Sequence, residues 1–221
     1  MKFEAVLLDC DGVLVDSEPI TNGVLCQMLN EAGWALTPAQ CMEWFIGKTV
    51  RSEAERIEAH TGRPLTDAWM AAFYALRDQG LHAHLQAIPG AVAAVQQCHA
   101  LLGGKIAVAS GADKAKVLMQ LDKVGLLPLF DPHIFSGHDL PRTKPFPDVY
   151  LAAAASLQRD PRRCLVIEDA LPGLQAGLAA GATVWGYCPW EGGHTTPEAL
   201  LAAGAQRVLR DMAELPGLLR H

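Results

Sequence analysis

The sequence predicts an α/β protein with a parallel sheet and an inserted α-helical domain. Two observations predict the sheet: short, wholly apolar segments recur along the chain, and from residue 88 onwards they alternate with helical segments. Strands that are apolar throughout are typical of a parallel sheet covered by helices on both faces. A third observation predicts the insertion, because the stretch between the first strand and residue 88 shows only helical patterns.

The predicted sheet is built from apolar runs of three to six residues. The expected strands are residues 6–8, 105–110, 133–136, 164–169, 183–187 and 207–209. The expected helices between them are residues 91–102, a helix opening near Asp113, residues 147–157 and 171–180, and a helix after Thr196.

The inserted helices are predicted from their start signals. In Thr37-Pro38-Ala39-Gln40, an N-cap residue is followed by Pro at the first helical position and by Gln three residues on, which is a capping box. Thr66 caps a later helix, and helices are also expected at residues 19–32 and 50–60. We therefore expect a core of residues 1–17 and 87–221 and a helical domain of residues 18–86.

Composition excludes several classes of protein. Half of the 221 residues are hydrophobic, which argues against disorder, and the net charge of −6 argues against a nucleic-acid surface. No apolar run reaches the length of a membrane span, and no signal sequence is expected, because the N-terminus leads directly into a predicted strand. The six cysteines are scattered without a CxxC pair, as in a reduced cytoplasmic protein. We expect a cytoplasmic monomer or weak dimer with no nucleic-acid or membrane partner.

Polar residues follow three of the predicted strands. Asp9 and Asp11 come after the first strand, Ser110 ends the second, and Glu168 and Asp169 end the fourth. In an open parallel sheet, ligands bind beyond the carboxyl ends of the strands, so these side chains are expected to share one crevice. Taken singly, each has a plainer reading: Asp-x-Asp-Gly and Ser-Gly make turns, and Glu-Asp favours a helix start.

The predicted crevice has the chemistry of phosphoryl transfer. Four carboxylates in one place repel one another by several kcal/mol, so they call for a cation, and oxygen-only donors suit Mg²⁺. A calcium loop fits poorly, because its pattern requires a further Asp or Asn and a distal Glu. Lys144 adds a compact positive charge suited to a phosphate, although a lone lysine is more often solvated. Asp9 is the candidate nucleophile and Asp11 the candidate acid and base.

These residues resemble the four ordered motifs of the haloacid dehalogenase-like (HAD) hydrolases over the whole chain. The matching segments are residues 9–18 (DCDGVLVDSE), Ser110-Gly111, residues 144–148 (KPFPD) and residues 166–169 (VIED). The insertion resembles the helical cap of the phosphoglucomutase and sugar-phosphatase branch. The resemblance implies a Rossmann-like three-layer core and a cap that closes over the substrate.

The resemblance also implies roles for the motif residues. Asp9 forms an aspartyl-phosphate, and Asp11 protonates the leaving oxygen and then deprotonates the attacking water. Ser110, Gly111 and Lys144 bind the phosphoryl group. The implied Mg²⁺ ligands are Asp9, the backbone carbonyl of Asp11, Glu168 and Asp169.

Several reactions share the first aspartate of this family. Asp11 argues against dehalogenation and phosphonate hydrolysis, because those relatives lack an acid at this position. Phosphomutases commonly carry a histidine where this chain has Thr21, so water is the expected acceptor. We expect a phosphatase acting on a sugar phosphate or sugar-acid phosphate. The segment Phe135–Leu140 resembles the corresponding segment of bacterial phosphatases that act on 6-phosphogluconate and related sugar phosphates. A β-phosphoglucomutase-type mutase and a non-catalytic binding module remain as alternatives.

Substrate specificity is expected to come from the cap. Lys48 and Arg51 follow a break at Gly47, and they either recognise a hydroxyl or second anionic group of the substrate or form a solvated helix start.

Overall fold

The computed structural model of the protein describes residues 2–45, 48–189 and 195–220. The strands are β1 (Ala5–Leu8), β2 (Ile106–Ser110), β3 (Ile134–Ser136), β4 (Cys164–Glu168), β5 (Thr183–Tyr187) and β6 (Arg207–Leu209). The α-helices are α1 (Glu18–Glu31), α2 (Pro38–Phe45), α3 (Ala54–Thr61), α4 (Asp67–His84), α5 (Ala91–Leu101), α6 (Lys114–Lys123), α7 (Leu127–Phe130), α8 (Asp148–Ser156), α9 (Leu171–Ala179), α10 (Pro197–Ala202) and α11 (Leu215–Leu219). Short 3-10 helices are η1 (Val50–Glu53), η2 (Gly137–Asp139), η3 (Pro161–Arg163) and η4 (Met212–Glu214).

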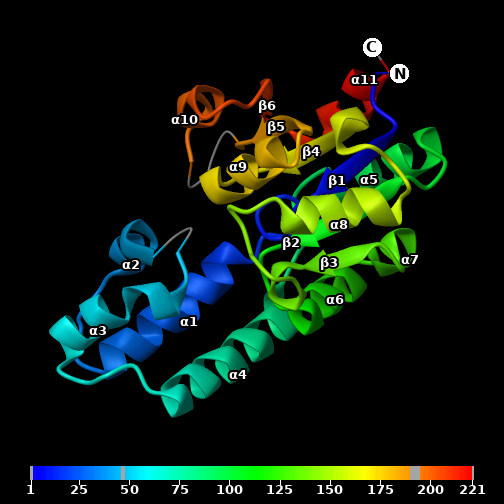
Figure 1. The fold of residues 1–221 in the computed structure, drawn as a ribbon. Coiled ribbons are helices and arrows are strands. Elements are labelled where there is room, and N and C mark those ends of the chain that lie inside the picture. The colour runs from blue at the N-terminus through cyan, green and yellow to red at the C-terminus, as the bar shows by residue number, and fades with distance from the viewer. Residues whose placement is uncertain (1, 46–47, 190–194, 221) are drawn as a thin grey trace. The chain divides into compact units, whose positions relative to one another are not determined.

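The chain divides into two compact units, one of Met1–Asp16 with Gln86–His221 and one of Ser17–Leu85. The described strands all belong to the first unit and form one parallel sheet in the order β3-β2-β1-β4-β5-β6 (Figure 1). Strand β1 pairs with both β2 and β4, so that Leu8 lies beside Val108 on one side and Ile167 on the other. The strand order reverses between β1 and β4, which places the binding crevice of such a sheet at their carboxyl ends.

Both faces of this sheet are buried. Ala5 and Leu7 of β1 belong to a hydrophobic cluster with residues of α8 and α9. Val6 and Leu8 point to the opposite face, because successive strand residues alternate, and they are fully buried as well. The predicted fold class, a Rossmann-like α/β core with a parallel sheet, is therefore confirmed.

The second unit contains helices and no strand among its described residues, and it has its own core. A cluster of buried side chains joins α1, α2, α3 and α4, and includes Leu29, Trp34, Phe45 and Phe73. The predicted capping box is present, since Thr37 Oγ1 accepts from the N–H of Gln40 (3.3 Å) while Gln40 Oε1 accepts from the N–H of Thr37 (2.9 Å). Thr66 Oγ1 likewise accepts from the N–H of Trp69, as expected of a helix cap.

Some expected elements differ from those of the structure. The helix expected over residues 50–60 is a 3-10 turn, η1, followed by the α-helix α3. Two short helices, α7 and α11, were not predicted, because four or five residues show no helical period.

Two expectations from composition can be compared with the described residues. None of the described helices is both long enough and apolar enough to cross a membrane. All six cysteines are buried and unpaired, as expected of thiols that serve as small core residues.

Candidate active site

The loop after β1 brings the first two aspartates to the carboxyl edge of the sheet. The N–H of Asp9 donates to the carbonyl of Ile167 in β4 (3.1 Å), so Asp9 is held beside the neighbouring strand end. Gly12 has φ +80°, and a Cβ at this position would overlap the carboxylate of Asp169. Only glycine fits this turn, because the turn requires both a left-handed conformation and a close approach to Asp169.

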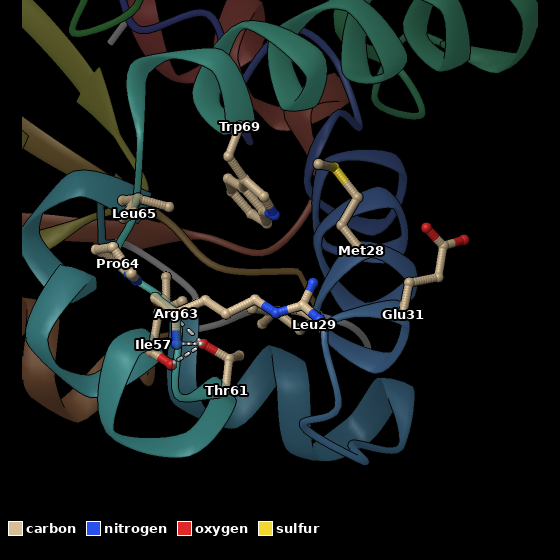
Figure 2. Close-up of a pocket in the computed structure, with 10 residues that line it drawn as sticks. Met28, Leu29, Glu31, Ile57, Thr61, Arg63, Pro64, Leu65 and Trp69 are labelled. Atoms are coloured by element: carbon tan, nitrogen blue, oxygen red, sulfur yellow. Dashed lines mark hydrogen bonds between the residues drawn. The ribbon is translucent and has the colours of Figure 1, made fainter.

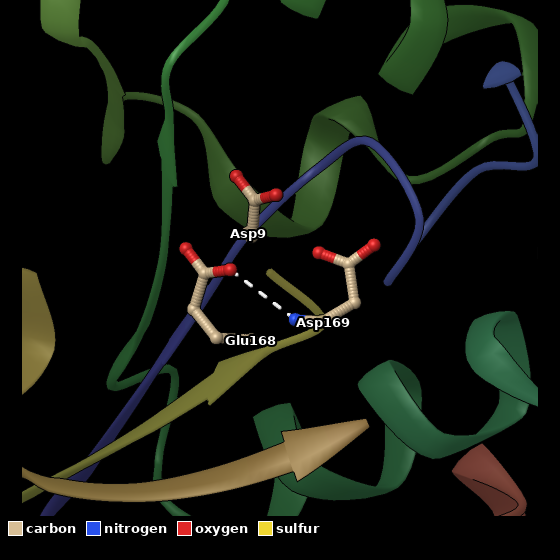
Figure 3. Close-up of side chains that lie close together, drawn as sticks. All are labelled: Asp9, Glu168 and Asp169. Carbon is tan, nitrogen blue, oxygen red and sulfur yellow. Dashed lines mark hydrogen bonds between the residues drawn. The ribbon is translucent and has the colours of Figure 1, made fainter. Parts of the chain in front are cut away.

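Three carboxylates from β1 and β4 converge beyond the sheet. Oxygens of Asp9, Glu168 and Asp169 all lie within 4.8 Å of one another, and each residue is at most 7% exposed (Figure 3). Lys144 joins them: its Nζ donates to Asp9 Oδ1 (2.8 Å) and to Glu168 Oε1 (2.6 Å). Buried carboxylates this close repel one another, and a cation bound among them would offset that repulsion.

Glu168 is held by donors on both of its carboxylate oxygens. Oε1 accepts from Lys144 and from the hydroxyl of Tyr150 (2.6 Å), while Oε2 faces the N–H groups of Asp169 (3.2 Å) and Ala170 (3.4 Å). Burial, together with the negative charge of Glu168, raises the pKa of Tyr150 well above its ordinary value. Tyr150 therefore stays protonated and remains a donor.

The electrostatics of this cluster favour the binding of a further cation. Burial raises the pKa of Asp9 to about 7, and Glu168 adds to this effect while Lys144 opposes it. Burial on its own would lower the pKa of Lys144, but the charges of Asp9 and Glu168 outweigh it and raise that pKa. Lys144 is thus a permanent cation, whereas ionised Asp9 is short of compensating charge.

Ser110 and Gly111 lie beside Lys144 at the end of β2. A Cβ at Gly111 would stand 3.9 Å from Lys144 Cδ, so the backbone of this loop runs along the lysine side chain. The Ser110 hydroxyl oxygen accepts from the N–H of Ala112 (3.0 Å), which leaves its proton available for donation to a ligand.

The carboxylate of Asp11 lies outside the metal-type group formed by the described acidic residues, and α6 holds it instead. Lys116 Nζ donates to Asp11 Oδ1 (2.9 Å) and Oδ2 (3.0 Å), and Gln120 Nε2 donates to Oδ1 (2.7 Å). Sequence reasoning missed Lys116, Gln120 and Tyr150. A detectable signal was the polar Gln120 between the apolar residues Val117 and Leu121 of the same helix.

The two cap cations have partners within their own unit. Lys48 Nζ donates to the carbonyl of Trp44 (2.9 Å) and lies 3.5 Å from Glu53, and Arg51 pairs with Asp67 (2.8 Å). Gly47, which the sequence analysis treated as a flexible break, lies outside the described residues. A role of Lys48 and Arg51 in substrate recognition stays a prediction.

A cavity of about 330 Å³ lies within the second unit (Figure 2). Apolar side chains line most of it, among them Met28, Leu29, Ile57 and Trp69, with Arg63 and Glu31 as charged lining residues. It contains none of the predicted catalytic residues, and its lining holds only one carboxylate, too few for a metal site. We assign this cavity no part in the reaction.

The structure defines an α/β protein with a cluster of buried carboxylates at the carboxyl ends of its central strands. Residues 3–181 match the family model of the haloacid dehalogenase-like hydrolases, and the chain belongs to this family. It is therefore a hydrolase, as the motifs indicated.

Named relatives include phosphatases. The chain is 30% identical over 188 residues to the 6-phosphogluconate phosphatase of Escherichia coli K12, covering 85% of this chain and 83% of that protein. It is 29% identical to the phosphoglycolate phosphatase of Nitrosospira multiformis, and the match covers 84% of this chain and 83% of that protein. The chain also resembles a crystal structure of a HAD family hydrolase from Deinococcus radiodurans that holds bound phosphate and sodium. The TM-score is 0.83 at 33% identity, and the match covers 99% of this chain and 95% of that one.

Proposed function

We propose that the protein is a Mg²⁺-dependent phosphatase that hydrolyses a small phosphorylated metabolite through an aspartyl-phosphate on Asp9. The observation that carries this proposal is the buried carboxylate of Asp9, placed between Lys144 and the acidic pair Glu168 and Asp169. A buried carboxylate beside a fixed ammonium is a nucleophile placed next to a binding group for the phosphoryl oxygens.

The residues fit a magnesium ion. Asp9, Asp169 and the backbone carbonyl of Asp11 would hold it as hard oxygen ligands, with Glu168 completing the acidic cluster. A bound Mg²⁺ would supply positive charge that offsets the repulsion among the carboxylates and between a carboxylate and a phosphate.

In the first half of the reaction, Lys144, Ser110 and the N–H groups of the loop after β2 bind the phosphoryl oxygens. An oxygen of Asp9 attacks phosphorus, a bond forms between them, and the bond to the leaving oxygen breaks. Asp11 gives its proton to that leaving oxygen. General acid help of this kind is worth about 10²–10⁴-fold in rate.

In the second half, water takes the place of the alcohol. Asp11, now ionised, accepts a proton from the water as it attacks phosphorus, the bond to Asp9 breaks, and inorganic phosphate leaves. This cycle returns both aspartates to their starting states, so the same residue serves as acid and then as base.

The substrate class we propose is a sugar phosphate or sugar-acid phosphate such as 6-phosphogluconate. Similarity to the E. coli 6-phosphogluconate phosphatase supports this class. Thr21, where phosphomutases commonly have a histidine, favours water over a sugar hydroxyl as the acceptor. We therefore expect no conversion of β-glucose 1-phosphate to glucose 6-phosphate in a coupled assay.

The proposal is tested by measuring phosphate release with and without Mg²⁺. The substrate panel contains 6-phosphogluconate, β-glucose 1-phosphate, nucleoside monophosphates and phosphoglycolate. We expect Mg²⁺-dependent release that disappears in a folded Asp9→Asn variant and persists in Asp122→Asn, a matched change at an exposed aspartate of α6. Full turnover by folded Asp9→Asn would rule out Asp9 as the nucleophile.

A further inference from the structure

Helix α6 presents two polar side chains to the loop after β1. Its first turn is fixed by Asp113, whose Oδ1 accepts from the N–H of Lys116 (2.8 Å). Lys116 and Gln120 are four residues apart, so they lie one above the other on the same face of the helix. That face points at Asp11, since both side chains donate to its carboxylate.

The contact fixes the carboxylate in two ways. Lys116 bridges both oxygens of Asp11 at 2.9 and 3.0 Å, and the amide of Gln120 adds a bond of 2.7 Å to Oδ1. Gln120 is fully buried, and the side chain of Lys116 is only 10% exposed. Charge-assisted bonds in such a partly buried setting are stronger and more directional than a surface ion pair.

A third residue fixes the direction of the Gln120 amide. The thiol of Cys10 donates to Gln120 Oε1 (3.5 Å), which turns the NH₂ group of the amide toward Asp11. Because Cys10 lies between the two aspartates in sequence, the network ties α6 to the backbone that carries both of them.

We propose that Lys116 and Gln120 are positioning residues that hold Asp11 for its two proton transfers. Their contacts are those of the ionised carboxylate, so they stabilise the negative charge that develops on Asp11 as it gives up its proton and then hold it in place as the base. The inference rests on the proposed function and goes beyond it by assigning each aspartate its own lysine. Lys144 holds the nucleophile and the phosphoryl group, whereas Lys116 holds the acid and base. A purely structural ion pair would contribute to stability without affecting one substrate more than another.

Substrates with different leaving groups distinguish a positioning role of Lys116 and Gln120 from a purely structural one. Phenyl phosphate and p-nitrophenyl phosphate have nearly the same shape, but p-nitrophenolate leaves without needing a proton, whereas phenolate benefits from one. Loss of the positioned acid therefore slows transfer from phenyl phosphate selectively. Hydrolysis of the aspartyl-phosphate needs Asp11 as a base with either substrate, so its rate falls in both cases.

The experiment compares Lys116→Met with Lys116→Arg, Gln120→Leu and Lys114→Met. Lys114 is an exposed lysine on the same helix and serves as the matched control. For Lys116→Met we expect kcat/KM to fall about 10–100-fold with phenyl phosphate and less than about threefold with p-nitrophenyl phosphate. When Lys116→Met is mixed rapidly with p-nitrophenyl phosphate, p-nitrophenol should appear in a burst approaching one equivalent per active site, because hydrolysis of the aspartyl-phosphate is slowed.

The other variants complete the test. Lys116→Arg restores most of the phenyl phosphate activity, Lys114→Met behaves as wild type, and Gln120→Leu shows the same selective loss to a smaller extent. Gln120→Leu keeps the ion pair, so it provides the result if Lys116→Met fails to fold. Equal losses with both substrates, or no loss, would overturn the inference. If the wild type itself shows no Mg²⁺-dependent release, the proposed function has failed instead.

Discussion

Substitution of Gly173 by alanine tests how tightly Glu168 is held. Gly173 is buried in the first turn of α9, and a Cβ there would overlap the Glu168 carboxylate. The added methyl group therefore pushes this side chain away from Tyr150 and Lys144. Gly23 of α1 provides the matched control, because it is exposed and a Cβ there meets nothing within 4 Å.

The two substitutions are expected to have opposite effects on stability. Each gains about 0.5–1 kcal/mol from the better helix propensity of alanine. At Gly173 this gain is outweighed by overpacking, at about 1–3 kcal/mol, and by weakened hydrogen bonds to a buried carboxylate, at about 1.5–3 kcal/mol. We expect a net loss of about 1.5–5.5 kcal/mol, or a Tm lower by about 3–22 °C for a chain of this size. Gly23→Ala should raise the Tm slightly.

Activity should fall as well, because displacing Glu168 removes one of the two carboxylates that hold the Lys144 ammonium. A shift of about 1 Å in a binding group can cost up to 10²-fold in rate, so kcat of Gly173→Ala should fall about 10–100-fold. Circular dichroism gives the Tm, and phosphate release below the transition gives kcat. A Gly173→Ala protein with wild-type Tm and wild-type kcat would refute the close packing of Glu168 against α9.

Two further perturbations test the electrostatics of the site. Tyr150→Phe removes one donor to buried Glu168 and should cost about 1.5–3 kcal/mol of stability, measured by urea unfolding; an unchanged midpoint would contradict this. Mg²⁺ affinity should rise with pH up to about 7, because burial raises the pKa of Asp9 to about 7 and a cation binds its ionised form. Below that pKa, the Mg²⁺ binding constant should rise about tenfold per pH unit. Calorimetric titration should show this rise in the wild type and a weaker dependence on pH in Asp9→Asn.

The sheet and most of the predicted site residues could be placed from local patterns. Apolar runs ending in Asp9, Ser110 and Glu168 are informative because parallel strands direct their carboxyl ends to one edge. The pairing of β1 with β2 and β4 then brings these ends together without any information on side chains.

Other features depend on contacts that no local pattern encodes. Lys116 lies 105 residues from Asp11, and the hydroxyl of Tyr150 reaches Glu168 from another helix. In the sequence, Lys116 looks like any solvated helix lysine. Likewise, Lys48 and Arg51 looked available for a substrate, but each has a partner within the second unit.

The most direct test of the account is to identify the residue that carries the phosphoryl group. Asp11→Asn is mixed with p-nitrophenyl phosphate and Mg²⁺, quenched in acid and digested for mass spectrometry. The account predicts that the peptide containing Asp9 gains one phosphoryl group, because transfer to Asp9 proceeds without the acid while hydrolysis lacks its base. Release of p-nitrophenol with no phosphorylated peptide, or with the phosphoryl group on a residue other than Asp9, would contradict it.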